Sequence, residues 1–105
     1  MIRPNLLTES EIENELKELP LWIRKENTIV REIVANDFIS AVAIFNSIAI
    51  IAESMDHHPD ILLYGWNKLR ITLSTHDRGG LTELDFKLAK KIEELYFIKK
   101  RNYEL

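Results

Sequence analysis

The chain of 105 residues contains no cysteine, and its one cluster of basic residues is the "KKR" at 99–101. Without cysteine, neither a disulfide framework nor a zinc site built on thiolates is possible. Phosphate binding requires several cations on one face, and the net charge of this chain is −3. We therefore predict that nucleic acid is not a partner of this protein.

Long apolar segments are also missing. The first residues, "MIRPNLLTESE", lack the apolar stretch of a signal peptide. The most apolar region, "FISAVAIFNSIAIIA" at 38–52, is shorter than a membrane span and contains Asn46 and Ser47. The contents of 46% hydrophobic and 30% charged residues are ordinary for a soluble protein. We expect a cytoplasmic protein with no membrane partner, folded as a single domain over 1–105.

The first third of the chain predicts a helix followed by a β-hairpin. Thr8 and Glu11 form the T-x-x-E pattern of a capping box, and the helix should end before Pro20. The segment 21–35 alternates between apolar and polar residues and is rich in β-branched side chains, with a turn expected at 26–27.

A long apolar helix should follow. Asn36 or Asp37 can cap it, and apolar residues recur at helical spacing until about Met55. Because it is so apolar, we expect this helix to be buried on most sides. Pro59 disfavours helical geometry at His58, so the helix should stop close to that residue.

The last part of the chain predicts a second hairpin and a final helix. "DILLYGW" and "KLRITLSTH" should pair around a turn at 67–68, with residues 69, 71 and 73 facing the core and 70, 72, 74 and 76 facing away. Thr82 and Asp85 form another capping-box pattern. The predicted order is α-β-β-α-β-β-α, an α+β two-layer sandwich whose four-stranded antiparallel sheet carries helices on one face.

All three histidines fall in two short segments, "SMDHHPDI" at 54–61 and "STHDRGG" at 74–80. With a turn at 67–68, antiparallel pairing would place residue 76 opposite residue 59. We therefore expect His57, His58 and His76 at one edge of the sheet. Imidazole titrates near neutral pH, so such a cluster suits acid/base catalysis.

Two carboxylates should lie beside this cluster. Glu53 precedes His57 by four residues, which places both on one face if the helix extends that far, and Asp85 begins the last helix. Other interpretations remain open: Asp85 could be a helix cap only, and Glu53 a solvated surface charge. Three histidines could also hold zinc, although the adjacent side chains of His57 and His58 diverge.

At these residues the sequence resembles the pterin-4a-carbinolamine dehydratases. The resemblance covers most of the chain after about residue 18. It rests on E-x-x-x-H-H-P-D at 53–60, followed by T-H-x-x-G-G-L-T-x-x-D at 75–85. It implies the fold order given above. It also implies elimination of water from 4a-hydroxytetrahydropterin to give quinonoid dihydropterin, a step of tetrahydrobiopterin recycling that uses no metal or organic cofactor.

The resemblance also implies roles for individual residues. His57 and His76 would transfer protons, and His58 would hold the pterin. Glu53 and Asp85 would be the supporting carboxylates.

The resemblance further implies that Asp60 and the backbone around 74–76, with Ser74 and Thr75, help to bind the flat pterin ring. Many members have an aromatic residue shortly after H-H-P, whereas Ile61 follows Asp60 here, so substrate packing on that side should differ.

The resemblance implies a homo-oligomer, a homodimer or homotetramer, and a narrow sheet with exposed edges favours the same expectation. Two other functions stay open. One is a protein-binding role as a dimerisation cofactor of a transcription factor, and the other is a role in another pterin pathway such as molybdopterin metabolism.

Overall fold

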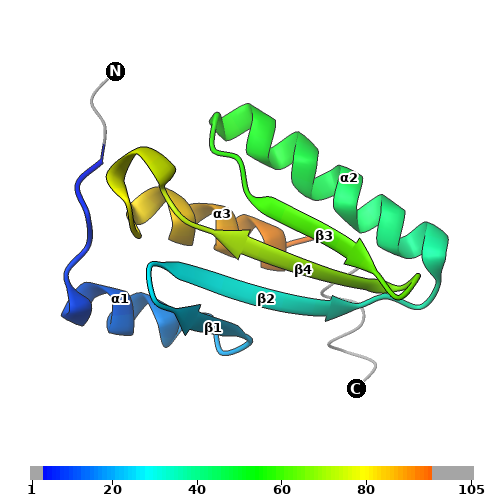
Figure 1. Cartoon of the computed structure of the whole chain (residues 1–105), viewed down its shortest axis with the longest axis horizontal. Helices are drawn as coiled ribbons and strands as arrows, with labels where there is room; N and C mark the ends of the chain where they lie inside the picture. Colours follow the sequence, from blue (N-terminus) through cyan, green and yellow to red (C-terminus); the bar gives the residue numbers. More distant parts are fainter. Residues whose placement is uncertain (1–3, 96–105) are drawn as a thin grey trace.

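The computed structural model describes residues 4–95, which form one antiparallel sheet of four strands with helices on one of its faces (Figure 1). The spatial order of the strands is β1-β2-β4-β3. The strands are β1 (Trp22–Lys25), β2 (Thr28–Val34), β3 (Asp60–Tyr64) and β4 (Lys68–Leu73). The helices are α1 (Glu9–Leu16), α2 (Phe38–Met55) and α3 (Glu83–Glu93), with a short 3₁₀ helix, η1 (His76–Arg78), before α3. The predicted α+β sandwich is confirmed.

The predicted capping boxes are present at two of the helices. The Thr8 side chain caps α1 while Glu11 reaches back to the Thr8 amide, and Thr82 and Asp85 do the same for α3. Asp37 caps α2 by accepting a hydrogen bond from the Ser40 amide at 2.8 Å. Hydrogen bonding to Ser40 lowers the pKa of Asp37, as expected for a carboxylate at a helix start.

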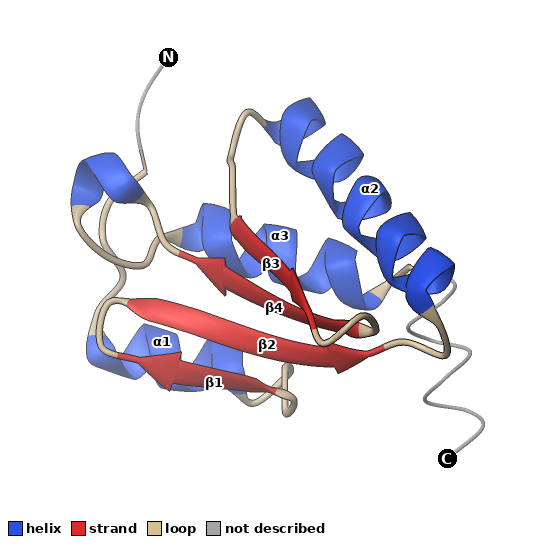
Figure 2. Cartoon of the chain, turned by 45° about the vertical axis from the view of Figure 1, so that its right-hand side comes forward, coloured by secondary structure: helices blue, strands red, loops and turns tan. Residues whose placement is uncertain are grey.

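The long helix α2 differs from the expectation of burial on most sides. One stripe faces the sheet and is buried, at Ala41, Ile44, Ile48 and Ala52, whereas Ile39 and Ile50 are 70% and 71% exposed. Counted to Met55, α2 has 18 residues and is long and apolar enough to cross a membrane by length and composition alone, with 22% of that stretch buried. The length of the apolar region therefore does not exclude a membrane span as the sequence suggested. In the described fold α2 packs along the sheet (Figure 2).

The strands of the second hairpin pair in a different register from the predicted one, because each residue of β3 faces a β4 residue three positions earlier in the chain. Tyr64 pairs with Lys68 and Asp60 with Thr72, so the turn occupies 65–67 instead of 67–68. Gly65 and Trp66 both have positive φ, at 53° and 59°. Glycine adopts this conformation without steric cost, which places the turn there. The predicted pairing of residue 76 with residue 59 is therefore wrong.

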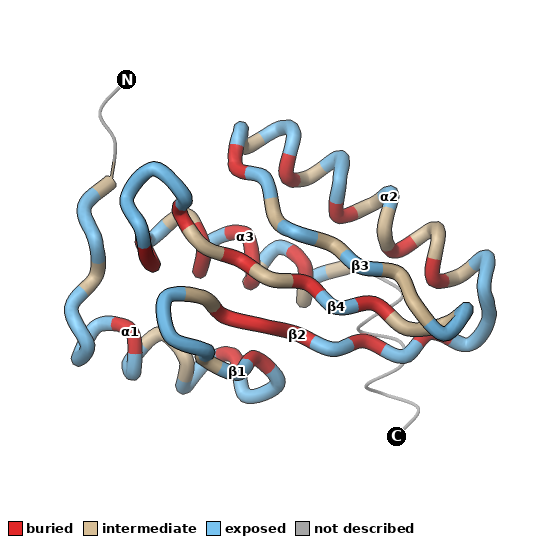
Figure 3. The backbone as a smooth tube through the Cα atoms, viewed as in Figure 1, coloured by how far each residue is buried: buried red, intermediate tan, exposed pale blue. Residues whose placement is uncertain are grey.

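The predicted alternation along the last strand is confirmed for the core. Leu69, Ile71 and Leu73 are fully buried and Arg70 is exposed, as the coloured tube of Figure 3 shows for β4. The strand ends at Leu73, so His76 does not continue it and instead begins η1.

A buried cation also lies in the core. Arg31 points inward from β2, and its Nε and Nη2 donate to the two carboxylate oxygens of Glu93, each at 3.2 Å. Its remaining Nη1 donates to the Glu32 carbonyl at 2.6 Å. This bidentate pairing satisfies the buried guanidinium and fastens α3 to the central strand.

Candidate active site

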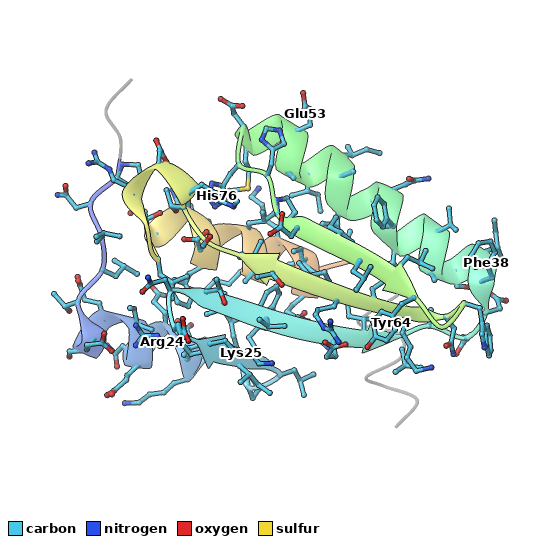
Figure 4. All side chains as sticks on the ribbon, in the orientation of Figure 1. Arg24, Lys25, Phe38, Glu53, Tyr64 and His76 are labelled. Carbon is cyan, nitrogen blue, oxygen red and sulfur yellow. The ribbon has the colours of Figure 1, made fainter. Side chains whose placement is uncertain are left out.

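A cleft of about 910 Å³ opens where the end of α2, the start of β3, the end of β4 with η1 and the start of α3 meet. Its lining contains all three histidines. It is lined by Pro4, Met55, Asp56, His57, His58, Pro59, Asp60, Ser74, Thr75, His76, Asp77, Glu83 and Leu84. Figure 4 shows His76 and Glu53 at this same end of the molecule. The predicted grouping of the histidines is therefore found, although the strand register on which it was based is wrong.

A left-handed turn at the end of α2 places His57. Asp56 has φ 50° and ψ 42°, and its amide and that of His57 both bond to the Ala52 carbonyl. Asp is one of the few residues that tolerate this conformation. The turn buries His57, which is 8% exposed, while His58 stays at the surface.

His57 is paired with a buried carboxylate. Its Nε2 lies 2.7 Å from Oδ1 of Asp85, which is fully buried. The carboxylate acts as an acceptor toward the Thr82 amide, at 2.9 Å from Oδ2, and toward the Thr75 hydroxyl, also at 2.9 Å from Oδ2. We therefore assign the hydrogen of the neutral His57 ring to Nε2, and Nδ1 is left as the nitrogen that can take up a proton.

Glu53 was predicted to lie beside His57, but in the structure it lies beside His58. Oε1 of Glu53 is 2.9 Å from Nε2 of His58, and the two side chains are 81% and 59% exposed. The prediction failed because α2 ends at Met55, so the i,i+4 relationship does not extend to His57. His58 lines the cleft and Glu53 lies beside it at the surface, where such an exposed pair contributes little to stability.

His76 comes from a different part of the chain, after the end of β4, and is the first residue of η1. It lines the cleft and is exposed. Within residues 4–95, no hydrogen bond holds its ring, so its two nitrogens are available to a bound molecule. The backbone of η1 is closed by Gly79, whose φ of 70° suits glycine and whose amide donates to the Thr75 and His76 carbonyls.

The three residues predicted to bind substrate are placed differently from one another. Asp60 and Ser74 line the cleft and are exposed and half-buried, respectively. Thr75 also lines it, but its hydroxyl is engaged with Asp85 and Thr82. Ile61 pairs with Ile71 and packs against the core, so it does not offer its side chain to the cleft.

The sequence did not indicate several cleft residues. Met55, Glu83 and Leu84 line the opening together with Pro4, and none of them belongs to a motif whose chemistry points to a site. The contact between the Thr75 and Thr82 hydroxyls, 2.7 Å apart, was also missed. Both threonines are visible in the T-H-x-x-G-G-L-T pattern, but their contact depends on how the glycine turn folds.

The described residues contain no group of three or more His, Asp or Glu side chains arranged to hold a metal ion. The reason is geometric. His57 is directed to Asp85 and His58 to Glu53, so the adjacent imidazoles belong to separate pairs. The site is thus a set of acid/base groups, one buried and oriented and two exposed, around a cleft of the size that small-molecule sites have.

The comparison with known proteins identifies the class of protein to which this chain belongs. The family model described as pterin 4 alpha carbinolamine dehydratase matches residues 5–95. The chain belongs to this family.

Relatives of known sequence and a solved structure support this family assignment. A candidate pterin-4-alpha-carbinolamine dehydratase of Sulfurisphaera tokodaii is 48% identical over 89 residues, which are 85% of this chain and 95% of the relative. One of Chloroflexus aurantiacus is 44% identical over the same shares. The crystal structure of a transcriptional coactivator/pterin dehydratase from Brucella melitensis has a TM-score of 0.80 at 37% identity, covering 85% of this chain and 96% of that one.

A more distant structure shares the fold alone. A pterin dehydratase-like protein, described as a RuBisCO assembly factor in the alpha-carboxysome, has a TM-score of 0.57 at 19% identity. It covers 69% of this chain and 82% of its own. The same arrangement of strands and helices therefore occurs in proteins described by different functions.

Proposed function

We propose that this protein eliminates water from a 4a-hydroxytetrahydropterin to give the quinonoid dihydropterin. The observation that carries the proposal is the buried His57–Asp85 pair in a cleft that His76 also lines, in a chain of the dehydratase family. In its proposed context the reaction recycles tetrahydrobiopterin in the cytoplasm.

The chemistry requires two proton transfers and nothing else. The bond between C4a and the hydroxyl oxygen breaks, and the oxygen leaves as water after receiving a proton. The N5 lone pair forms a double bond to C4a, and N5 loses its hydrogen to a base. One proton is supplied and one is removed, so the step needs no oxidant or reductant, and imidazole groups can do both.

We assign the two transfers to His57 and His76. His57 is oriented by Asp85 through Nε2, which leaves Nδ1 for proton transfer. His76 lies in the same cleft, and its ring makes no hydrogen bond to another described residue. Either histidine can take either role, because an imidazole nitrogen donates or accepts according to its protonation.

The other site residues hold the pterin. His58 lines the cleft with its ring exposed and paired with Glu53, so it is suited to hydrogen bonding with the polar edge of a pterin. Asp60 and Ser74 add an acceptor and a hydroxyl within the cleft, and we propose that Thr75 contributes through its backbone.

An assay of 4a-hydroxytetrahydropterin dehydration with the purified protein tests the proposal. We expect acceleration that persists after treatment with a chelator, and its loss in a variant carrying both His57→Ala and His76→Ala. A rate equal to the uncatalysed one would contradict the proposal. It would favour the protein-binding alternative, since the Brucella melitensis relative is described as a transcriptional coactivator as well as a pterin dehydratase.

We also propose that the protein is a homodimer or homotetramer and that α2 forms a contact between copies. Three exposed residues of α2, Ile39, Asn46 and Ile50, and the half-buried Ala43 are spaced by four, three and four positions, which is the spacing of a coiled-coil seam. No charged side chain occurs from 38 to 52, so this side is costly to leave in water. The outer strands β1 and β3 add open edges to which another copy can pair.

A further inference from the structure

We propose that the Thr75 hydroxyl is a positioning group for catalysis, which holds the Asp85 carboxylate in the orientation that fixes the His57 ring. The inference deepens the proposed function and rests on it. It assigns to Thr75 a role through its side chain, in place of a direct hydroxyl contact with the pterin.

The contacts form one buried cluster. Thr75 Oγ1 lies 2.9 Å from Asp85 Oδ2 and 2.7 Å from Thr82 Oγ1. Thr75 is 4% exposed, and Thr82 and Asp85 are 0% exposed. Water therefore does not compete for these groups, and each hydrogen bond has greater influence on its neighbours than it would at the surface.

The hydroxyl hydrogens can be assigned by counting donors and acceptors. An Asp85 carboxylate only accepts, so the Thr75 hydrogen points to Oδ2. The Thr82 hydrogen must then point to Thr75 Oγ1, while Thr82 Oγ1 accepts from the Leu84 amide at 3.3 Å. The result is a chain of donors that runs from the Leu84 amide through Thr82 and Thr75 to Oδ2 of the carboxylate. The other oxygen, Oδ1, accepts from Nε2 of His57.

The local fold fixes Thr75 for this task. Thr75 and Gly80 form an isolated β-bridge, in which the Thr75 amide donates to the Gly80 carbonyl at 2.8 Å. A Cβ atom at Gly80 would lie 3.0 Å from Leu6 Cδ2, so the loop is closely packed at that point. The bridge returns the chain so that Thr82 lies beside Thr75.

The Thr75 backbone also helps to position His76, the second proposed catalytic histidine. Its carbonyl accepts hydrogen bonds from the amides of Arg78 and Gly79, both at 3.0 Å, which form η1 directly after it. The Thr75 side chain is thus connected to His57 through Asp85, and its backbone anchors His76. We infer that Thr75 fixes the positions of the His57 and His76 rings relative to each other.

Removal of the hydroxyl should change the chemistry more than the binding. The hydroxyl is already engaged, so its loss deletes no free donor from the cleft. A carboxylate that has lost one donor is held less firmly, so it orients the His57 ring less well for the chemical step. The pH–rate profile should therefore change together with kcat, because the carboxylate that faces the imidazole has a different set of partners.

The central experiment compares Thr75→Val, which keeps the shape and loses the hydroxyl, with Thr75→Ser, which keeps the hydroxyl. We expect Thr75→Val to lower kcat about 10- to 100-fold, the range of one hydrogen bond to a charged group, with KM changed less than threefold and the pH–rate profile altered. Thr75→Ser should restore most of kcat and the original profile.

Thr28→Val is the matched control. The Thr28 hydroxyl also makes one hydrogen bond, to the Lys25 carbonyl at 2.8 Å, in the β1–β2 turn away from the cleft residues. It should lower stability slightly and leave kcat and the pH profile unchanged. If Thr75→Val likewise lowers only the melting temperature, with wild-type kcat and pH profile, then Thr75 is structural and the inference is wrong.

A readout independent of turnover separates this inference from the proposed function. In ¹⁵N-labelled wild-type protein, we expect the His57 ring to carry a slowly exchanging hydrogen on Nε2, and this hydrogen to exchange faster in Thr75→Val. If the wild type lacks dehydratase activity but shows this difference, the positioning role stands and the proposed reaction fails. If Thr75→Val does not fold, Thr75→Cys, with a weaker donor of similar size to Ser, replaces it. Unchanged exchange in the folded variant overturns the inference.

Discussion

His57 Nε2 lies 2.7 Å from Asp85 Oδ1, although 28 residues separate the two positions in the chain. The contact joins the turn after α2 to the first turn of α3, and both groups are buried. Asp85 is at once the capping-box residue of α3 and the acceptor for the imidazole. The interpretation of Asp85 as a helix cap is therefore confirmed, and its contact with His57 is compatible with the proposed supporting role.

Asp85→Asn should damage both activity and stability. The amide presents an NH₂ group to one of the donors that now face the carboxylate, so at least one buried donor loses its acceptor. We expect kcat to fall about 100-fold or more and the free energy of unfolding to fall by about 1–3 kcal/mol. Steady-state kinetics and thermal unfolding measure the two effects. Glu13→Gln, an exposed change of the same kind on α1, should alter neither, and wild-type kcat in Asp85→Asn would contradict the assignment.

His58→Ala should act mainly on substrate binding. The His58 ring is 59% exposed and its partner Glu53 is 81% exposed, so no buried network depends on it. The loss of one hydrogen bond to substrate should raise KM about 3- to 10-fold, with turnover changed less than threefold and the melting temperature unchanged. If turnover instead falls by about two orders of magnitude while KM is unaltered, then His58, and not His57 or His76, transfers a proton.

Local patterns predicted the elements well, because their causes are local. The Thr8–Glu11 and Thr82–Asp85 boxes and the burial of 69, 71 and 73 require only neighbouring residues. The register of the second hairpin could not be predicted, because it depends on Trp66 adopting a positive φ next to Gly65. A bulky residue seldom does so, and no sequence pattern signals it.

The sequence predicted correctly that the three histidines lie close together, but it gave Glu53 the wrong histidine as its partner. One histidine segment comes directly before β3 and the other follows β4, at the same end of the two paired strands. A shifted turn therefore still brings them to one cleft. The partner of Glu53 depended on where α2 ends. The left-handed Asp56 ends it at Met55, turns His57 inward and leaves His58 beside Glu53.

Glu32, outside the cleft, should make the stability of the fold depend on pH. The hydrogen bond from the Tyr64 hydroxyl, aided by Arg70, lowers the pKa of Glu32 below its ordinary value of 4.5. A lowered folded-state pKa stabilises the protein above the unfolded pKa, and this stability is lost as the pH falls through the folded value.

Glu32→Gln should therefore lower the melting temperature at pH 7 by at most a few degrees, since these groups are exposed. The difference from wild type should shrink as the pH falls below 4.5. Thermal scans across pH measure it, with Glu26→Gln on the exposed β1–β2 turn as the control. A difference that grows toward low pH would be the wrong sign.

Ile50→Glu should disrupt self-association. Ile50 is 71% exposed on the apolar side of α2, and a carboxylate there would be buried or repelled in a helix contact between copies. We expect wild type to be a dimer or larger by light scattering at micromolar concentration and Ile50→Glu to be smaller. Ser10→Glu, with the same change in charge on α1, should keep the wild-type mass. A wild-type monomer that instead floats with phosphatidylcholine vesicles would identify a membrane as the occupant of this surface.

His76→Ala should separate catalysis from folding more cleanly than any other change in the cleft. His76 is exposed, begins η1, and makes no side-chain hydrogen bond to another described residue, so the substitution should change stability by less than about 0.5 kcal/mol. A positioned acid or base contributes about 100- to 10,000-fold in rate. The dehydration rate should fall within that range, while binding of a pterin product, measured by fluorescence quenching, and the melting temperature stay close to wild type. If the variant unfolds while its remaining folded fraction keeps full turnover, His76 is a structural residue and the assignment of proton transfer to it is wrong.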